Sequence, residues 1–385
     1  MEERQRNAHM TPSSLVLLSS NSFWNIVNFR GALVEALVAE GYRVQILTPD
    51  VDSRWANAVG VKATEIAVDR SGLNPIVDAL VWLNYVRIFR RERPRVFLSY
   101  TAKPNIYGSL AAQISGVESI PNVSGLGTAF IRGGLLSRFV TMLYRLAFRR
   151  SRIVFFQNPD DRELFVAKNI VSTGQARLLP GSGVDLERFA PGTTAPDKDQ
   201  ICFLFIGRLL GDKGVREFVE AARSLRADRP GWRFQLLGET DPDNRSGISS
   251  DEVRQWVDQG LVEHLGHAED VRPHIQAATA VVLPSYREGM PRSLLEAAAM
   301  ARPLIATDVP GNRQLVDHGV NGLLCEARNP QELAEAMAAL GSMGVERRAQ
   351  MGQASRAKVE RSYGVDRVVA AYLEALAQLG AEARV

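Results

Sequence analysis

The chain has 385 residues, which is too long for a single typical core and favours two α/β domains of roughly 150–200 residues each. Its composition is ordinary for a globular protein. It contains no run of eighteen apolar residues and begins with polar and charged residues, so we expect neither a membrane-spanning helix nor a signal peptide. Residues 1–185 hold 22 Lys and Arg against 15 Asp and Glu, whereas residues 186–385 hold 24 against 28. The basic first half is therefore expected to meet an anionic surface or a phosphate-bearing acceptor.

The first predicted elements form a β-α-β unit. After a leader at residues 1–12 that we expect to be disordered, the apolar run at 13–20 predicts a buried parallel strand. Residues 21–41 predict a loop and an amphipathic helix, and residues 43–49 a second strand. The loop lacks a G-x-G-x-x-G fingerprint, which argues against a dinucleotide cofactor.

Two further segments continue this plan. Residues 75–100 predict a helix that runs into a third strand, and residues 119–131 predict a fourth strand followed by glycines. Ligands of open parallel sheets sit beyond the carboxyl ends of the strands, and glycine lets the backbone approach a ligand closely. The residues expected to line this ligand site, which the resemblance described below assigns to an acceptor, are Trp24, Asn25, Lys103, Asn105, Gly125 and Gly127.

Residues 135–156 combine apolar residues at helical spacing with several arginines. One interpretation is a helix docked on the sheet with its arginines in solvent. The other is a basic amphipathic face that rests on anionic lipid. The sequence leaves both open. The arginines are Arg138, Arg145, Arg149 and Arg150.

A second domain follows residues 192–200, which have the composition of a linker, so we place the boundary near residue 190. Short apolar runs then alternate with helical patterns and predict a second doubly wound sheet. Cys202 and Cys325 lie in two of these runs, which predicts buried thiols and neither a disulfide nor a metal site. The runs are 201–207, 233–238, 262–266, 280–285, 303–307 and 322–326.

Residues 280–302 predict a strand, a sharp turn and a helix, because Pro291 suits a first helical turn and Pro303 cannot continue one. The backbone N–H groups at this helix start and the helix dipole favour an anion such as a diphosphate. Glu288 in the loop and Glu296 on the helix are more than one turn apart, so they reach different parts of one ligand. The donor-binding residues expected in this segment are Glu288, Gly289, Met290, Pro291, Arg292 and Glu296.

A second turn supplies cations. Gly207 ends a predicted strand, and Arg208 and Lys213 flank the turn that follows. Two cations at the carboxyl end of a strand can offset the charge that grows on a departing nucleoside diphosphate. Gly266 and His267 end another strand and are predicted to lie by the base, although a plain surface position suits His267 equally well.

No aspartate pair convincingly predicts a divalent ion. Asp50 with Asp52, and Asp241 with Asp243, are better explained by turn chemistry. We therefore expect no metal and no other cofactor.

Together these segments resemble the family-4 retaining glycosyltransferases of the GT-B fold. The resemblance lies in two glutamates separated by seven residues with Gly-x-Pro between them, and in three further segments in the family's order. It implies that Glu288 contacts the donor sugar, that Glu296 binds the ribose, and that Arg208 and Lys213 hold the diphosphate. The three segments are "GSGVDLERFAP" (181–191), "GRLLGDKGVREFVEAA" (207–222) and "VPGNRQLVDHGVNGLL" (309–324).

In the first half, residues 101–116 and 119–131 are similar to a subset of the family that extends sugars carried on polyprenyl diphosphate. That subset includes N-acetylgalactosaminyl-transferring members. Two departures leave contacts open: Ser124 and Gly125 stand where many members carry a histidine that meets the donor sugar, and Gln314 takes a place often held by glutamate.

We therefore predict an α/β protein of the GT-B fold, with two facing Rossmann-like doubly wound domains and an interdomain cleft. The acceptor-binding domain is placed at 13–190 and the nucleotide-sugar-binding domain at 191–362. By resemblance, a last helix at about 363–385 crosses back to the first domain.

The predicted activity is retaining, metal-independent transfer of N-acetylgalactosamine or another N-acetylhexosamine from a UDP-sugar to a polyprenyl-diphosphate-linked sugar, in bacterial surface polysaccharide or glycan biosynthesis. Glu288, Arg208 and Lys213 are the predicted catalytic residues. Expected partners are both substrates and an anionic membrane surface, with no nucleic acid. The expected location is cytoplasmic and peripheral, on the inner face of the plasma membrane. The alternatives are a UDP-sugar epimerase or hydrolase of the same fold, and a non-catalytic nucleotide-sugar-binding protein.

Overall fold

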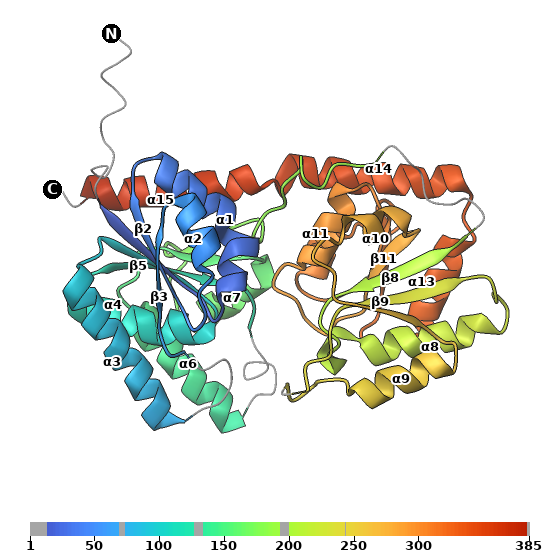
Figure 1. The fold of residues 1–385 in the computed structure, drawn as a ribbon, viewed down its shortest axis with the longest axis horizontal. Coiled ribbons are helices and arrows are strands. Elements are labelled where there is room, and N and C mark those ends of the chain that lie inside the picture. Colours follow the sequence, from blue (N-terminus) through green and yellow to red (C-terminus); the bar gives the residue numbers. More distant parts are fainter. Residues whose placement is uncertain (1–13, 69–73, 127–133, 193–199, 243, 383–385) are drawn as a thin grey trace, which may run out of the picture. The chain divides into compact units, whose positions relative to one another are not determined.

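The computed structural model describes residues 14–68, 74–126, 134–192, 200–242 and 244–382, so the predicted leader lies outside the described residues. The chain forms two compact units (Figure 1). Unit 1 comprises Met1–Ser182 and Val365–Val385, and unit 2 comprises Gly183–Gly364.

The first boundary lies earlier in the chain than residue 190. The segment after Ser182 packs in unit 2, because Val184 and Phe189 are buried in its core and the Val184 N–H donates to Tyr363 O at 2.9 Å. Residues 183–190 were expected in the first domain and belong to unit 2. The mixture of apolar and charged residues in this short segment gave no sign of the two buried anchors.

Unit 1 contains a seven-stranded parallel sheet in the order β3-β2-β1-β4-β5-β6-β7. The order reverses between β1 and β4, and the crevice beyond the carboxyl ends of such a strand pair is where open sheets bind ligands. The strands are β1 (Leu15–Ser19), β2 (Arg43–Thr48), β3 (Lys62–Glu65), β4 (Val96–Tyr100), β5 (Glu118–Val123), β6 (Val154–Phe156) and β7 (Ala176–Leu178).

Helices cover both faces of this sheet, because successive side chains of each strand point to opposite sides. In β1, Val16 and Leu18 pack with α1 and α15, while Leu15 and Leu17 pack with α3 and α4. Figure 1 shows these two helix layers on either side of the strands. The helices are α1 (Phe23–Ala39), α2 (Ser53–Val59), α3 (Pro75–Glu92), the π-helical turn η1 (Pro104–Gly108), α4 (Ser109–Ser115), α6 (Gly134–Phe148), α7 (Pro159–Ala167) and α15 (Val365–Glu382).

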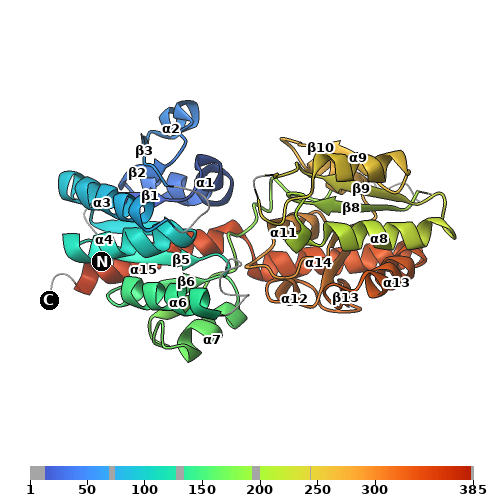
Figure 2. The ribbon, with the colours of Figure 1, turned by 90° about the horizontal axis from the view of Figure 1, so that it is seen from below.

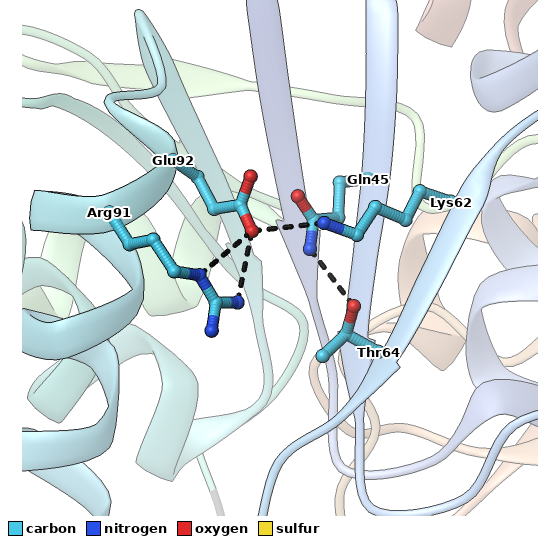
Figure 3. Close-up of polar contacts among 5 residues, drawn as sticks. All are labelled: Gln45, Lys62, Thr64, Arg91 and Glu92. Atoms are coloured by element: carbon cyan, nitrogen blue, oxygen red, sulfur yellow. Dashed lines mark hydrogen bonds and ion pairs between the residues drawn. The ribbon is translucent and has the colours of Figure 1, made fainter.

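The outer edge of this sheet is tied to α3 by polar side chains (Figure 3). Gln45 Nε2 on β2 donates to Thr64 Oγ1 on β3 at 2.9 Å. Lys62 Nζ on β3 lies 2.9 Å from Glu92 Oε1 at the end of α3, and Arg91 donates to the same oxygen. These hydrogen bonds, that from Lys62 above all, lower the pKa of Glu92. Arg91 therefore forms an ion pair with Glu92.

Unit 2 contains a six-stranded parallel sheet in the order β10-β9-β8-β11-β12-β13, in agreement with the six predicted runs. Figure 2 shows β10, β9 and β8 next to one another. The order reverses between β8 and β11, which makes their carboxyl ends the expected ligand site. The strands are β8 (Cys202–Ile206), β9 (Arg233–Leu237), β10 (Glu263–Gly266), β11 (Ala280–Leu283), β12 (Leu304–Thr307) and β13 (Gly322–Cys325).

The core of unit 2 is one continuous apolar cluster made by the strands and the inner faces of the helices. Both cysteines are free and buried, as predicted, and Cys325 belongs to this cluster. Among the described residues, no helix is both long and apolar enough to cross a bilayer. The helices are η2 (Gly211–Lys213), α8 (Val215–Arg226), α9 (Ser250–Asp258), α10 (Arg272–Ala277), α11 (Arg292–Ala299), α12 (Asn312–Leu315), α13 (Pro330–Gly341) and α14 (Val345–Ser362).

Candidate active site

The carboxyl ends of β8, β9 and β10 each carry a glycine, so the backbone there has no side chains. Gly207, Gly238 and Gly266 end these neighbouring strands, with φ values of +153°, +152° and +68° that side chains rarely adopt. A Cβ on Gly238 would lie 1.9 Å from Gly207 O, so only glycine fits there. The Gly238 N–H donates to Gly266 O at 2.8 Å. Gly238 was not among the predicted site residues, because its need for glycine arises from a neighbouring strand.

The loop after β11 (residues 284–291) is fixed against the turn η2 that follows β8. Gly214 has φ +74°, and a Cβ there would lie 2.1 Å from Pro284 O. The Tyr286 N–H donates to Asp212 O at 3.0 Å. Because β8 and β11 are neighbours in the sheet, two turns that are distant in sequence pack backbone to backbone.

This packing brings two of the predicted catalytic residues together. Lys213 Nζ lies 2.5 Å from Glu288 Oε1, and the two side chains are 29% and 11% exposed. The carboxylate and the ammonium therefore neutralise each other in a partly buried place, at the point where strand order reverses.

The turn after β12 supports Glu288 from its other side. The Glu288 N–H donates to Pro310 O at 3.2 Å. Gly311 has φ +86°, and a Cβ there would lie 2.8 Å from Glu288 O. Deeper in the unit, Thr307 Oγ1 donates to Ser285 O and accepts from Asn312 Nδ2 at 3.0 Å. Two turns, η2 and the turn after β12, therefore fix the backbone that carries this carboxylate.

The other predicted cation, Arg208, has a more open environment. Its side chain is 63% exposed, and Nη1 lies 2.7 Å from Asp241 Oδ2. Asp241 O also accepts the Asn244 N–H at 3.0 Å, so the expected turn is present, but the side chain has the additional task of holding Arg208. No local pattern links these two residues. The link depends on the pairing of β8 with β9.

Helix α11 begins directly after this loop. Its N-cap is Pro291, which offers no side chain to cap the first turn, so the positive end of the helix dipole faces the loop residues. The helix ends at Ala299, before the predicted end at residue 302, because Ala301 adopts φ +54° and turns the chain. Met290 is 8% exposed and packs in the core.

Glu296 lies on the inner side of α11. It is buried, and its Oε1 accepts from Arg292 Nε at 2.6 Å. Burial raises the pKa of the Glu296 carboxyl, while Arg292 acts in the opposite direction. A carboxylate so placed is a strong hydrogen-bond acceptor held in one orientation.

The remaining predicted residues of unit 2 lie at the edge of its sheet. His267 is exposed after β10, while its neighbour His264 places Nε2 2.8 Å from Gly238 O. Within the described chain, no three His, Cys, Asp or Glu side chains are grouped closely enough to hold a metal ion. The absence of a cofactor stays a prediction.

In unit 1, two predicted acceptor residues follow β1. Trp24 is 57% exposed, and its ring centroid lies 5.3 Å from that of Phe29 in a T-shaped contact. The Asn25 N–H donates to the helix-capping Ser22 Oγ at 3.2 Å, while the Asn25 side-chain oxygen is buried and makes no hydrogen bond within the described residues.

The segment after β4 contains two more predicted acceptor residues. Lys103 Nζ lies 2.9 Å from Asp78 Oδ1, and Tyr107 OH donates to Asp78 Oδ2 at 2.8 Å. Asn105 is buried: it accepts from Ser99 Oγ and donates to a backbone oxygen of β5, both at 2.8 Å. These contacts do not favour a role for Asn105 in acceptor binding, which stays untested.

The two glycines after β5 complete the predicted set. Gly125 has φ +151°, a conformation that favours glycine. Gly127 lies outside the described residues.

Two family models match the chain. Residues 27–199 match the model described as "Glycosyl transferase 4-like domain", and residues 200–342 match "Glycosyl transferases group 1". The matches meet between residues 199 and 200, close to the start of β8.

Two relatives cover most of the chain. N,N'-diacetylbacillosaminyl-diphospho-undecaprenol alpha-1,3-N-acetylgalactosaminyltransferase of Campylobacter jejuni is 28% identical over 333 residues, which are 82% of this chain and 86% of the relative. UDP-Gal:alpha-D-GlcNAc-diphosphoundecaprenol alpha-1,3-galactosyltransferase of Escherichia coli is 25% identical over 281 residues, 68% of this chain and 70% of the relative.

Solved structures share the fold. Sucrose-phosphate synthase from Thermosynechococcus elongatus superposes with a TM-score of 0.80 and 20% identity, covering 96% of this chain and 100% of that one. Anabaena HepE in complex with UDP gives a TM-score of 0.75 at 17% identity, covering 95% and 100%. The chain therefore belongs to the glycosyltransferases of the GT-B fold, with a 4-like domain in its first half and a group 1 domain in its second.

Proposed function

We propose that this glycosyltransferase transfers an N-acetylhexosamine from a UDP-sugar to a sugar carried on polyprenyl diphosphate, with retention of configuration and without a metal ion. The observation that carries the proposal is the Lys213–Glu288 pair beside the start of α11. These groups lie where the strand order reverses between β8 and β11. A cation and a helix start suit the diphosphate of a sugar nucleotide, and a carboxylate suits the hydroxyls of its sugar.

In this proposal the donor diphosphate lies over the start of α11 and is held by Lys213 and Arg208. Both cations have carboxylate partners in the structure, Glu288 and Asp241. A diphosphate carries more negative charge than one carboxylate, so it would draw Lys213 away from Glu288. The released Glu288 would then contact the donor sugar, and Glu296 would hold the ribose.

We propose the following bond changes for a transfer that retains configuration. The acceptor hydroxyl oxygen bonds to the anomeric carbon while the bond from that carbon to the diphosphate oxygen breaks on the same face. UDP leaves with the electron pair, and its departing oxygen takes the hydroxyl proton. Lys213, Arg208 and the helix dipole stabilise the charge that develops on UDP. A covalent sugar adduct on a side chain, detected by mass spectrometry, would contradict this front-face route.

The names of the two curated relatives support the acceptor class. Both act on sugars linked through diphosphate to undecaprenol, and the C. jejuni enzyme transfers N-acetylgalactosamine. Such an acceptor is anchored in a bilayer by its prenyl chain. Transfer would therefore take place at a membrane surface, which we propose to be the inner face of the plasma membrane, in bacterial polysaccharide or glycan assembly.

One assay tests the proposal. The protein is incubated with UDP-N-acetylgalactosamine or UDP-N-acetylglucosamine, with and without a short-chain polyprenyl-diphosphate sugar, while UDP release and lipid mass are followed. We expect UDP release and a gain of one N-acetylhexosamine only when the lipid is present. UDP release or an epimerised sugar from the donor alone would favour a hydrolase or an epimerase. Binding without turnover would favour a nucleotide-sugar-binding protein.

A further inference from the structure

Unit 1 carries an extended apolar face on three helices, with α4 packed between α3 and α6 (Figure 1). Of the twelve large apolar side chains that are exposed in the described chain, eight belong to these helices. Single exposed apolar residues are common on protein surfaces, whereas a contiguous apolar patch marks an interaction site. The eight residues, which we call the α3–α4–α6 face, are Ile76, Leu80, Leu83, Ile114, Leu136, Phe139, Met142 and Leu146.

The helical spacing places these side chains in stripes. On α3, Ile76, Leu80 and Leu83 stand at i, i+4 and i+7, which is one side of a helix. The opposite side of α3 packs onto the sheet, where Tyr85 and Phe89 are buried. The exposed stripe is therefore additional to what the fold requires.

Helix α6 shows the same division. Val140, Tyr144, Ala147 and Phe148 are buried in the core that it shares with β5 and β6. Phe139, at 49% exposed, lies outside that core. The predicted helix is present, and three of its apolar residues, Leu136, Phe139 and Leu146, face outward.

The three helices enclose a shallow groove of about 440 Å³. Its walls are mainly apolar: Ala79 and Trp82 come from α3, Leu110 from α4, and Phe139 and Leu143 from α6. The groove opens among the exposed stripes, so the apolar surface is continuous from α3 to α6 across α4.

The exposed charged residues that border this face on α3 and α6 are arginines. Arg87 and Arg90 on α3 and Arg138 on α6 are exposed, as is Arg149 directly after α6. Neither α4 nor α6 contains an acidic residue. On α3, Asp78 is buried against Lys103 and Tyr107, and Glu92 is matched by Lys62 and Arg91. Both acidic residues of α3 are therefore paired with basic side chains, and the net charge around the face is positive.

We infer that the α3–α4–α6 face binds the surface of an anionic lipid bilayer. Apolar stripes bordered by arginine are typical of helices that lie in the interfacial layer, where apolar side chains enter the acyl region and cations meet lipid phosphates. The sequence had suggested one such helix, and the structure adds α3 and α4 to it. The choice of a bilayer rests partly on the proposed function, which gives the enzyme a membrane-anchored acceptor.

The test uses the full-length protein without donor or acceptor. Binding is measured by flotation with vesicles of phosphatidylcholine alone and of phosphatidylcholine mixed with phosphatidylglycerol. We expect binding to the anionic vesicles, reduced at high salt. The double variant Leu80→Asp with Phe139→Asp should bind them about tenfold more weakly or worse, because two groups that enter the apolar layer become anions. Arg87→Gln with Arg138→Gln should weaken binding to the anionic vesicles alone.

A matched control is Val320→Asp, which changes an exposed apolar residue of unit 2 and should leave vesicle binding unchanged. Circular dichroism checks that every variant is folded. Equal vesicle binding by the wild type and the double variant would overturn the inference. So would absence of vesicle binding together with self-association that the double variant abolishes, since the face would then be a protein interface.

A second measurement separates this inference from the proposed function. Transfer to a short-chain acceptor in detergent does not need a bilayer, so the double variant should retain it. Vesicle binding without any transfer by the wild type would leave the membrane face standing and remove the proposed substrates.

Discussion

At the scale of single residues, the charged groups of the candidate site hold one another in pairs. Lys213 with Glu288, Arg208 with Asp241 and Arg292 with Glu296 each lie within 2.7 Å. The first and third pairs are largely shielded, where charge interactions are stronger than in water. In the proposed function, a diphosphate would therefore compete with a carboxylate for Lys213, which would couple donor binding to the release of Glu288.

This coupling predicts opposite effects of the two glutamates. Glu288→Ala should lower turnover by about 10²–10³-fold while leaving UDP affinity unchanged or slightly higher, since Lys213 loses its competing carboxylate. Glu296→Ala should weaken UDP by about tenfold or more, because a buried charged acceptor is lost. Initial rates and calorimetric titration with UDP distinguish the two. Small, equal effects from both variants would contradict these roles.

Asp270 gives a prediction about acid stability. Hydrogen bonds from the Arg272 side chain, aided by its backbone N–H, lower the pKa of Asp270 to about 2. Its ordinary pKa is near 3.8, so the unfolded chain takes up this proton first. The stabilisation is complete above pH 3.8 and is lost as the pH falls toward 2.

Thermal unfolding between pH 5 and pH 2 should therefore show a shallower decline for Asp270→Asn than for the wild type. The difference should be small and should shrink in high salt, because the pair is partly exposed. The exposed Asp258→Asn controls for the loss of one charge. Parallel pH profiles for Asp270→Asn and the wild type would refute the assignment.

At the scale of elements, the site depends on close contact between turns. Gly214 and Gly311 both lie against the loop that carries Glu288, and each has a positive φ. The backbones of the turns are in contact, so a methyl group on either glycine would force the turn or the loop to move. The position of the loop that carries Glu288 is thus set by two glycines through close backbone contact.

Gly214→Ala should destabilise the protein by about 3–5 kcal/mol, because it adds left-handed strain to a clash with Pro284 O. It should also reduce turnover by displacing Lys213. Gly260→Ala is the matched control: Gly260 has φ +66° but open space around its Cβ position, so strain alone should cost about 1 kcal/mol. Denaturant unfolding midpoints measure both. Equal losses would mean that the contact with Pro284 O yields without cost.

At the scale of the whole molecule, unit 1 is completed by the end of the chain. Helix α15 contributes Val368, Tyr372, Leu376 and Leu379 to the core beneath α1. Tyr372 is fully buried, its ring centroid lies 4.8 Å from that of Phe155, and its OH accepts from Asn122 Nδ2 at 2.9 Å. The core of unit 1 is therefore complete only when α15 is packed in place.

Tyr372→Ala should destabilise unit 1 by about 3–5 kcal/mol through the cavity it leaves. The Asn122 amide would also lose its partner. Glu374→Ala, an exposed change on the same helix, should have little effect. Hydrogen exchange resolved by mass spectrometry would report the loss in β4 to β6 while leaving unit 2 protected. Uniform loss of protection in both units would show that they unfold together.

Much of the fold could be predicted from local patterns. Apolar runs such as 201–207 and 280–285 became β8 and β11, because a strand buried on both faces must be apolar throughout. Short elements such as β3 and α2 were not predicted, since β3 is only four residues long and half-exposed. The first boundary was misplaced because Val184 and Phe189 reveal their burial only when unit 2 is assembled.

The sequence by itself determined which residue types the candidate site contains: Glu288, Glu296, Arg208 and Lys213 stand out through spacing and resemblance. Only the tertiary structure decided which of these charged side chains form ion pairs with one another. Lys213 meets Glu288 and Arg208 meets Asp241 because neighbouring parallel strands align the turns at their carboxyl ends. The same holds for the α3–α4–α6 face. A stripe on one helix is visible in the letters, but its continuation across three helices arises only when the sheet places them side by side.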